Sequence, residues 1–181
     1  VAYDQSLDGV SLPSGLQTLT FGMFFNQTLD GVVLPSGLHI LTFGMRFNQS
    51  LSGVIFPSGL TTLTFGVTFN QSLRGLTLPA GLQVMTFGSS YNQSLSGVAL
   101  PRDLQCLTFG DSFNQSMDGI SLPPGLHTLT FGTRFNHSLL RVTLPSRLRT
   151  LTFGDDQNLD GIDMPAALEG LCMLGVSVVA A

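Results

Sequence analysis

The sequence has 181 residues, and charged residues make up only 10% of it, against about 25% in an ordinary soluble domain. Its net charge is −4, so it lacks the basic field that draws nucleic acid to a protein. It also contains no apolar run long enough to span a membrane. We therefore expect neither a nucleic-acid partner nor a membrane span, and the 21 glycines and 9 prolines indicate a structure shaped by turns.

A period of 22 residues organises the chain, and the unit reads LPSGLxxLTFGxxFNQSLxGVx. Repeats of this length indicate a solenoid of stacked coils. The Phe-Gly pairs of successive units begin at Phe21, Phe43, Phe65, Phe87, Phe109, Phe131 and Phe153. Residues 1–153 form these tandem repeats, and residues 154–181 form a degenerate last unit, two residues short, that is predicted to cap the C-terminal end. Val1 falls in mid-repeat, so we expect a piece of a longer chain, and the compartment stays open.

Each unit offers two segments that alternate apolar and polar side chains, which is the pattern of a strand. The first is 41–43 and its equivalents, and the second is 54–56 and its equivalents. Gly44 ends the first because glycine permits positive φ, and Pro57 ends the second because proline donates no ladder hydrogen bond. Because such glycines and prolines recur in every unit, long helices cannot form. The sequence thus predicts an all-β solenoid of about eight coils, with two short strands per coil and little or no helix.

Stacking is required because one coil cannot fold alone. About seven apolar side chains per unit would contribute roughly 10–20 kcal/mol if fully buried. Ordering each residue of the unit costs at least about 1 kcal/mol, so the two terms nearly cancel. Neighbouring coils supply the burial and the strand pairing together. The Phe column is therefore predicted to be buried, one ring above the next.

The unit resembles a known family, the FNIP repeat, a 22-residue relative of leucine-rich repeats, and the resemblance covers nearly the whole chain. The matching residues are Phe47-Asn48, Leu51, Leu60, Leu63 and Phe65-Gly66, with their copies. This chain has FNQS where the name-giving motif has Ile-Pro. The resemblance implies a leucine-rich-repeat-like solenoid. Both candidate strands fit the leucine-rich pattern, and we favour 41–43 and its equivalents for the main sheet because its outward positions are more uniform.

One Asn per coil forms a second column and allows two interpretations. A buried amide can bond the backbone of the next coil as a ladder. Each Asn also begins an N-glycosylation sequon, and the two interpretations compete because a buried amide cannot accept a glycan. The ladder is favoured. The positions are Asn26, Asn48, Asn70, Asn92, Asn114 and Asn136.

The outward Thr of the first segment forms the candidate binding face. These residues are Thr20, Thr42, Thr64, Thr86, Thr108, Thr130 and Thr152. Positions just before the strands differ between coils and would contact a partner, namely His39, Gln83, Gln105, His127 and Arg149. Thr is also an ordinary strand former on a solvated face. A second, incomplete Thr rank leaves ice binding as an alternative, although leucine-rich-like curvature argues against it.

No catalytic, cofactor or metal site is predicted. Cys106 and Cys172 lie three repeats apart, about 14 Å, too far for a disulfide, so two free thiols are expected. The stretch Asp156–Gly161 matches the opening of a calcium loop, but Ala167 stands where the loop needs Glu. The histidines lack zinc-ligand spacing. Four arginines, at 134, 141, 147 and 149, crowd near the C-terminal end, either as a solvated surface or for an acidic partner.

The leading functional prediction is a non-enzymatic solenoid that serves as a protein-binding or scaffold surface. A monomer with another protein as its partner is expected. The alternatives are an extracellular structural or adhesive glycoprotein segment and an ice-binding Thr array.

Overall fold

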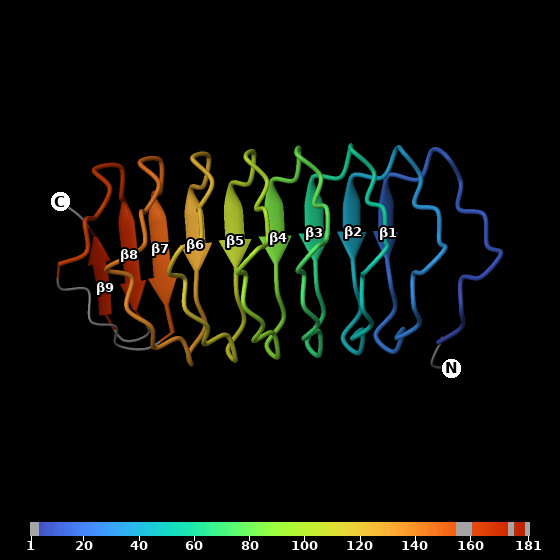
Figure 1. Cartoon of the computed structure of the whole chain (residues 1–181), viewed down its shortest axis with the longest axis horizontal. Helices are drawn as coiled ribbons and strands as arrows, with labels where there is room; N and C mark the ends of the chain where they lie inside the picture. Colours follow the sequence, from blue (N-terminus) through green and yellow to red (C-terminus); the bar gives the residue numbers. More distant parts are fainter. Residues whose placement is uncertain (1–3, 155–160, 174–175, 180–181) are drawn as a thin grey trace.

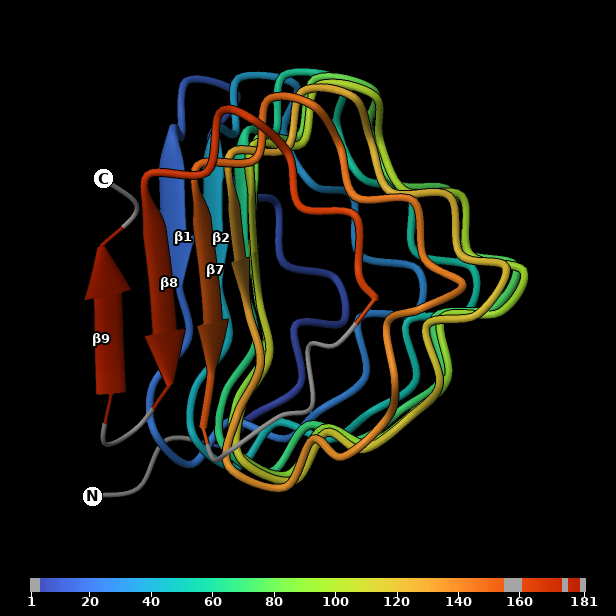
Figure 2. The same ribbon diagram turned by 90° about the vertical axis from the view of Figure 1, so that its left-hand side faces the viewer.

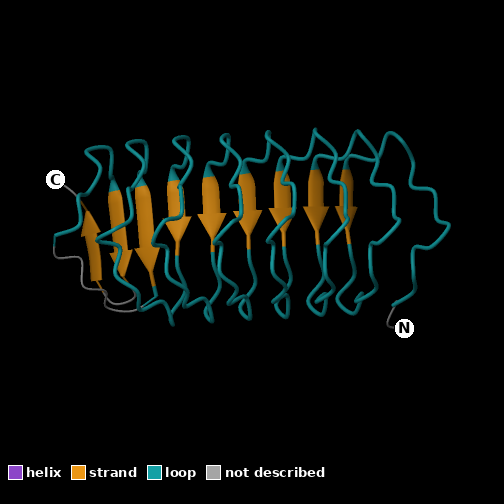
Figure 3. Ribbon diagram, in the orientation of Figure 1, coloured by secondary structure: helices purple, strands orange, loops and turns teal. Residues whose placement is uncertain are grey.

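The computed structural model describes residues 4–154, 161–173 and 176–179, and these residues form an elongated solenoid with one short strand per coil (Figure 1). They contain no helix, and turns and loops make up the rest of each coil (Figure 3). None of the described segments offers a helix with the length and apolarity that a membrane crossing needs. The strands are β1 (Thr18–Thr20), β2 (Ile40–Thr42), β3 (Thr62–Thr64), β4 (Val84–Thr86), β5 (Cys106–Thr108), β6 (Thr128–Thr130), β7 (Thr150–Phe153), β8 (Gly170–Met173) and β9 (Val176–Val179).

The strands form one sheet in chain order, with β1 to β8 parallel. Thr42 pairs with Thr64, a step of 22 residues, whereas Thr150 of β7 pairs with Gly170 of β8, a step of 20. The shorter step is the two-residue deletion seen in the sequence. Strand β9 then pairs antiparallel with β8. The division into repeats over 1–153 and a cap over 154–181 stays a prediction, and the calcium-like stretch falls largely outside the described residues.

Backbone hydrogen bonds extend the pairing beyond the three-residue strands. The N–H groups of His39 and Ile40 both donate to the carbonyl oxygen of Gln17, at 2.8 and 3.1 Å. At the other end of the strand, the N–H of Phe21 donates to the carbonyl oxygen of Thr42 at 2.9 Å. The same set recurs at later coils, which places the first predicted segment in the main sheet, as favoured.

The prediction of a second strand per coil is wrong. Residues 54–56 and their equivalents are irregular, and no backbone hydrogen bond joins neighbouring coils there within the described part of the chain. Turns close on both sides of this segment, from Leu51 to Val54 and from Pro57 to Leu60, and Pro57 has no N–H to donate. The predicted inward side chains are nevertheless buried, since Val54 is 7% and Phe56 8% exposed. At 54–56 the alternation of apolar and polar side chains therefore predicts burial correctly but does not predict strand pairing.

The core is built from columns of Leu and Phe, and the Phe-Gly column is stacked as predicted. The rings of Phe43 and Phe65 have centroids 5.6 Å apart and lie in nearly parallel planes, and Phe65 and Phe87 follow at 5.2 Å. A second aromatic column, from the Phe-Asn motif, packs beside it, with Phe69 4.1 Å from Phe65. Each ring therefore touches neighbours above, below and beside it. The column of the Phe-Gly motif is Phe21, Phe43, Phe65, Phe87, Phe109, Phe131 and Phe153.

The glycine after each of these phenylalanines has a role other than the predicted one. Gly44 has no positive φ. A Cβ on Gly44 would instead lie 1.9 Å from the carbonyl oxygen of Gly22, because the backbones of adjacent coils approach closely there. Positive φ belongs to another column, as at Gly53 with φ of 86°, in the turn after Leu51, where the third turn position needs it. Two glycine columns thus serve two different physical needs.

Tyr91 occupies a position that holds Phe in the equivalent coils. Its side chain is fully buried, and its hydroxyl has no hydrogen-bond partner among the described residues. Burial raises the pKa of Tyr91 well above its ordinary value. Its ring keeps the stacking of the column, with Phe87 at 3.9 Å. Tyr91 thus carries a desolvated polar atom that its phenylalanine counterparts lack.

Replacing Tyr91 with phenylalanine is expected to raise the free energy of unfolding by about 1 kcal/mol. The change removes a buried hydroxyl that has lost its water partners without gaining a protein partner. Guanidinium denaturation followed by circular dichroism measures the difference. A clear loss of stability would show that the hydroxyl has a partner, such as a buried water.

Candidate binding surface

The predicted Thr column lies on the outward side of the parallel sheet, which we call the strand face. Thr42 pairs with Thr64 and Thr64 with Thr86, so the column runs along the solenoid in register. These side chains are half-buried, whereas Leu41 and Phe43 on either side of Thr42 point into the core. The hydroxyl column is therefore an open surface backed by a packed core. The structure places the rank as predicted, while its role in binding stays a prediction.

The strand face is concave along the solenoid. Seen from the C-terminal end, β1 and β8 stand farther out on the strand side than the coils between them (Figure 2). A second outward rank lies beside the first, but Ile40, Val84 and Cys106 interrupt its threonines. Curvature and interruption both disfavour the ice-binding alternative, which needs two flat, complete ranks. A concave face suits a rounded or extended partner better.

The positions just before the strands form a flanking column on the border of the strand face. His39, Gln83 and Gln105 are exposed and His127 is half-exposed, as expected for residues free to contact a partner. Arg149 is also exposed, and its Nε lies 3.8 Å from Oε1 of Glu169. That pair stabilises the fold little, because both side chains are more than 60% exposed (61% and 73%) and solvent screens the interaction.

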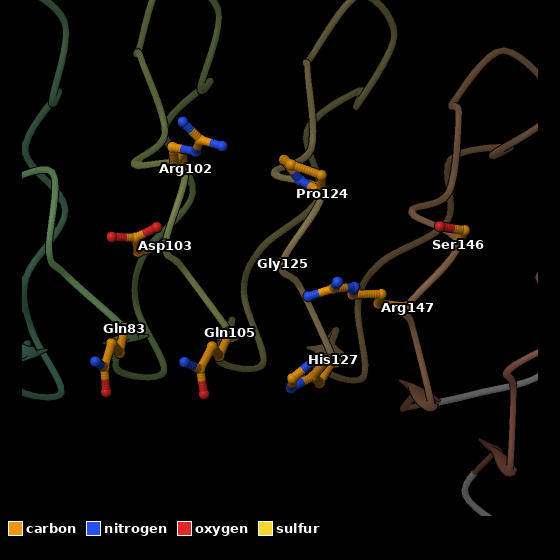
Figure 4. Close-up of a pocket in the computed structure, with 9 residues that line it drawn as sticks. All are labelled: Gln83, Arg102, Asp103, Gln105, Pro124, Gly125, His127, Ser146 and Arg147. Carbon is orange, nitrogen blue, oxygen red and sulfur yellow. The ribbon is translucent and has the colours of Figure 1, made fainter.

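A groove opens beside the N-terminal ends of β4 to β6, where this flanking column meets the preceding turns (Figure 4). Its volume is about 450 Å³. Sequence inspection missed it, because its rims come from turn positions that look unremarkable one coil at a time. The lining residues are Gln83, Arg102, Asp103, Gln105, Pro124, Gly125, His127, Ser146 and Arg147.

The four arginines that crowd near the C-terminal end of the sequence do not form one patch. Arg147 lines the groove, while Arg141 borders a separate hollow near Thr143 on another part of the coil. Arg102, from two coils earlier, joins Arg147 instead. Comparing equivalent repeat positions would have found this pairing, since 102–103 and 146–147 are the same two positions of the unit.

The Asn column forms the predicted ladder. Oδ1 of Asn48 accepts the backbone N–H of Asn70 at 2.8 Å and the side-chain amide of Gln71 at 3.1 Å. The pattern holds from Asn26 to Asn136, and Asp4 begins it by accepting the N–H of Asn26 at 2.8 Å. Each Asn from 26 to 114 thus satisfies a backbone donor of the next coil. In the Phe-Asn motif, the Phe ring therefore stacks in the core while the adjacent Asn side chain hydrogen-bonds the next coil.

Replacing Asn70 with alanine is expected to lower the free energy of unfolding by about 1–3 kcal/mol. The change leaves the backbone N–H of Asn92 without its acceptor, which is bonded at 2.8 Å. Asn70→Asp is the matched control, because Asp4 already fills this role in the first coil. Thermal melts of the two variants should differ, and equal losses would contradict a ladder that depends on the side-chain oxygen.

Glycosylation of the sequons stays a prediction. The ladder engages Oδ1 of the Asn residues from 26 to 114. The Asn residues differ in accessibility, since Asn114 and Asn136 are exposed and the earlier four are half-buried. Any glycan would therefore meet the least obstruction at these two positions.

The remaining candidates for chemistry lie apart. Cys106 is a free, half-exposed thiol on β5, and Cys172 lies three strands away on β8. In the part of the chain that the structure describes, no three His, Cys, Asp or Glu side chains come together as a metal site.

The comparisons with known proteins agree with this geometry. The family model FNIP Repeat matches six overlapping stretches, at residues 3–46, 25–68, 47–90, 69–112, 91–134 and 113–156. A solved structure, described as CroV588, a novel circular LRR protein, superposes with a TM-score of 0.78 and 36% sequence identity. The match covers 90% of this chain but only 27% of that one. No curated protein matches the sequence. With its repeats matched from residue 3 to residue 156, the chain belongs to the FNIP repeat family.

Proposed function

We propose that the chain is a non-enzymatic scaffold that binds another protein through its strand face and the flanking column. The observation that carries the proposal is the concave sheet, which holds a Thr in each strand from β1 to β7, in register over a packed core. The seven steps between the eight parallel strands span about 34 Å along the axis. A stable complex buries about 800 Å² on each partner, so a partner has to contact the flanking column as well as the narrow strand face.

The chemistry of the face supports a protein partner. Thr presents a methyl group and a hydroxyl, so the rank can contact apolar side chains and hydrogen-bond a peptide backbone. The flanking column adds amide, imidazole and guanidinium groups that differ from coil to coil, as His39, Gln83 and His127 illustrate. Repeat solenoids present such extended concave surfaces to their partners. The non-enzymatic assignment rests on this family architecture, and the monomeric state stays a prediction.

The test selects peptide ligands by display against the immobilised chain and then maps their binding. Thr86→Arg with Thr108→Arg places bulk and charge on the strand face, where both residues are half-buried in register. We expect affinity to fall about tenfold or more. The matched control is Thr77→Arg with Thr143→Arg, on exposed positions away from the strands.

The control pair should leave affinity within about twofold, because it adds the same charge without touching the strand face. Isothermal titration calorimetry gives the dissociation constants of both double variants. If the control pair weakens binding as much as the strand-face pair, the partner binds elsewhere and the proposal fails.

A further inference from the structure

The groove beside β4 to β6 owes its shape to one coil that lacks a side chain at Gly125, between two coils that carry arginine. The equivalent turn positions hold Arg102-Asp103, then Pro124-Gly125, then Ser146-Arg147. Gly125 contributes no side chain, so the middle coil forms a floor and its neighbours form the rims. In Figure 4, Arg102 stands on one rim, and the side chain of Arg147 reaches from the other toward the Gly125 coil.

The groove is positive in a chain that is negative overall. Arg102 and Arg147 bring two guanidinium groups to it, and Asp103 brings the one carboxylate. Among the described residues, the ion pair of this region joins Arg149 to Glu169, and neither groove arginine is paired with a carboxylate within 4 Å. Two guanidinium groups thus face a hollow whose net charge differs in sign from the −4 of the whole chain.

Amide groups line the remaining wall. Gln83 and Gln105 sit at equivalent positions on adjacent coils, and His127 continues their column. The N–H of Gln105 donates to the carbonyl oxygen of Gln83, and that of His127 to the carbonyl oxygen of Gln105, each at 2.8 Å. These bonds fix the backbone and leave the side chains to point outward (Figure 4). An amide can both donate to and accept from a peptide backbone.

We propose that this groove binds a carboxylate-rich segment of a partner protein. The guanidinium groups of Arg102 and Arg147 would bind Asp or Glu side chains in the two-bond geometry that arginine favours, and Gln83 and Gln105 would bind the segment's backbone. The inference rests on the proposed function, because it assumes that the surface holds a protein. A nucleic acid fits less well, since its dense phosphate charge would meet only two guanidinium groups on an acidic chain.

The test measures fluorescence anisotropy of a fluorescein-labelled peptide of alternating Glu and Gly, at about 50 mM salt so that screening is limited. We expect saturable binding that the same peptide with Gln in place of Glu does not show. Arg102→Glu with Arg147→Glu should weaken binding about tenfold or more. The control is Arg74→Glu with Arg134→Glu, which changes the net charge equally at exposed positions outside the groove and should stay within about twofold.

Three outcomes would overturn the inference. These are no saturable binding by the native chain, equal losses in both double variants, and tighter groove-dependent binding of a labelled oligouridine than of the Glu peptide. The proposed function is judged separately on the display-selected ligands. If those ligands respond to Thr86→Arg with Thr108→Arg while the Glu peptide fails to bind, the scaffold role stands and the acidic-segment inference falls. If no selected ligand responds to that pair, the scaffold role fails whatever the Glu peptide does.

Discussion

Replacing Gly88 with alanine is expected to lower the free energy of unfolding by about 3 kcal/mol or more. A Cβ on Gly88 would lie 2.1 Å from the carbonyl oxygen of Gly66, a backbone atom that no side-chain rotation can move. The coils could separate only by breaking the bonds beside it, such as Phe65 N–H to the carbonyl oxygen of Thr86 at 2.8 Å. Guanidinium denaturation followed by circular dichroism measures the loss.

Gly81→Ala in the same coil is the matched control. Gly81 has no positive φ, and its Cβ would meet only Ser58 oxygen, at an ordinary 3.7 Å. Two equivalent positions already hold Asp103 and Arg147. The control should therefore stay within about 1 kcal/mol of the native chain, with a small gain from reduced freedom of the unfolded state. Similar losses at both glycines would contradict the close approach of the coils at the Phe-Gly motif.

Replacing Phe69 with alanine is expected to cost about 3–5 kcal/mol. Its ring is fully buried and lies 4.1 Å from Phe65, 6.0 Å from Phe47 and 6.1 Å from Tyr91, measured between centroids. Its removal opens a cavity in the middle of the stack. Because each coil is stabilised mainly by its neighbours, we also expect the two halves to unfold less cooperatively.

Two controls separate this effect from a general loss of apolar surface. Phe69→Leu keeps most of the volume and should cost about 1 kcal/mol. Ile55→Ala removes an apolar side chain that is 84% exposed and should change stability by less than about 0.5 kcal/mol. Calorimetry of the three variants ranks their losses of stability. If Phe69→Ala lowered the free energy of unfolding no more than Phe69→Leu, the rings would not form a continuous core.

The sequence predicts the stacked coils well because one pattern is repeated in each. The alternation at Leu63, Thr64 and Phe65 specifies which side chains face the core, and a repeat of fixed length places equivalent residues above one another. The Asn ladder follows from the same fixed repeat length, because a polar side chain present once in every coil lies next to the equivalent side chain of the neighbouring coil. These features depend on local chemistry and on the period alone.

Other features depend on how neighbouring coils approach, which one coil's sequence does not contain. The alternation at 54–56 buries Val54 and Phe56 without pairing. A glycine is required at Gly44 and at Gly53, but only the structure separates close approach from positive φ. The groove needs a missing side chain at Gly125 beside two arginine-bearing coils. Its signal was present in the sequence and becomes visible only when the coils are compared position by position.

The central claim is that coils stack at a constant spacing, so that the Thr column runs along a rod. Spin labels on cysteines placed at Thr20, Thr42 or Thr64, each paired with one at Thr130, test it directly once Cys106 and Cys172 are replaced by alanine. The registers predict that the mean label distance rises by about 4.8 Å for each added coil. Distances that level off or fall as the sequence separation grows would mean that the chain packs as a ball, and the stacked concave face would have to be abandoned.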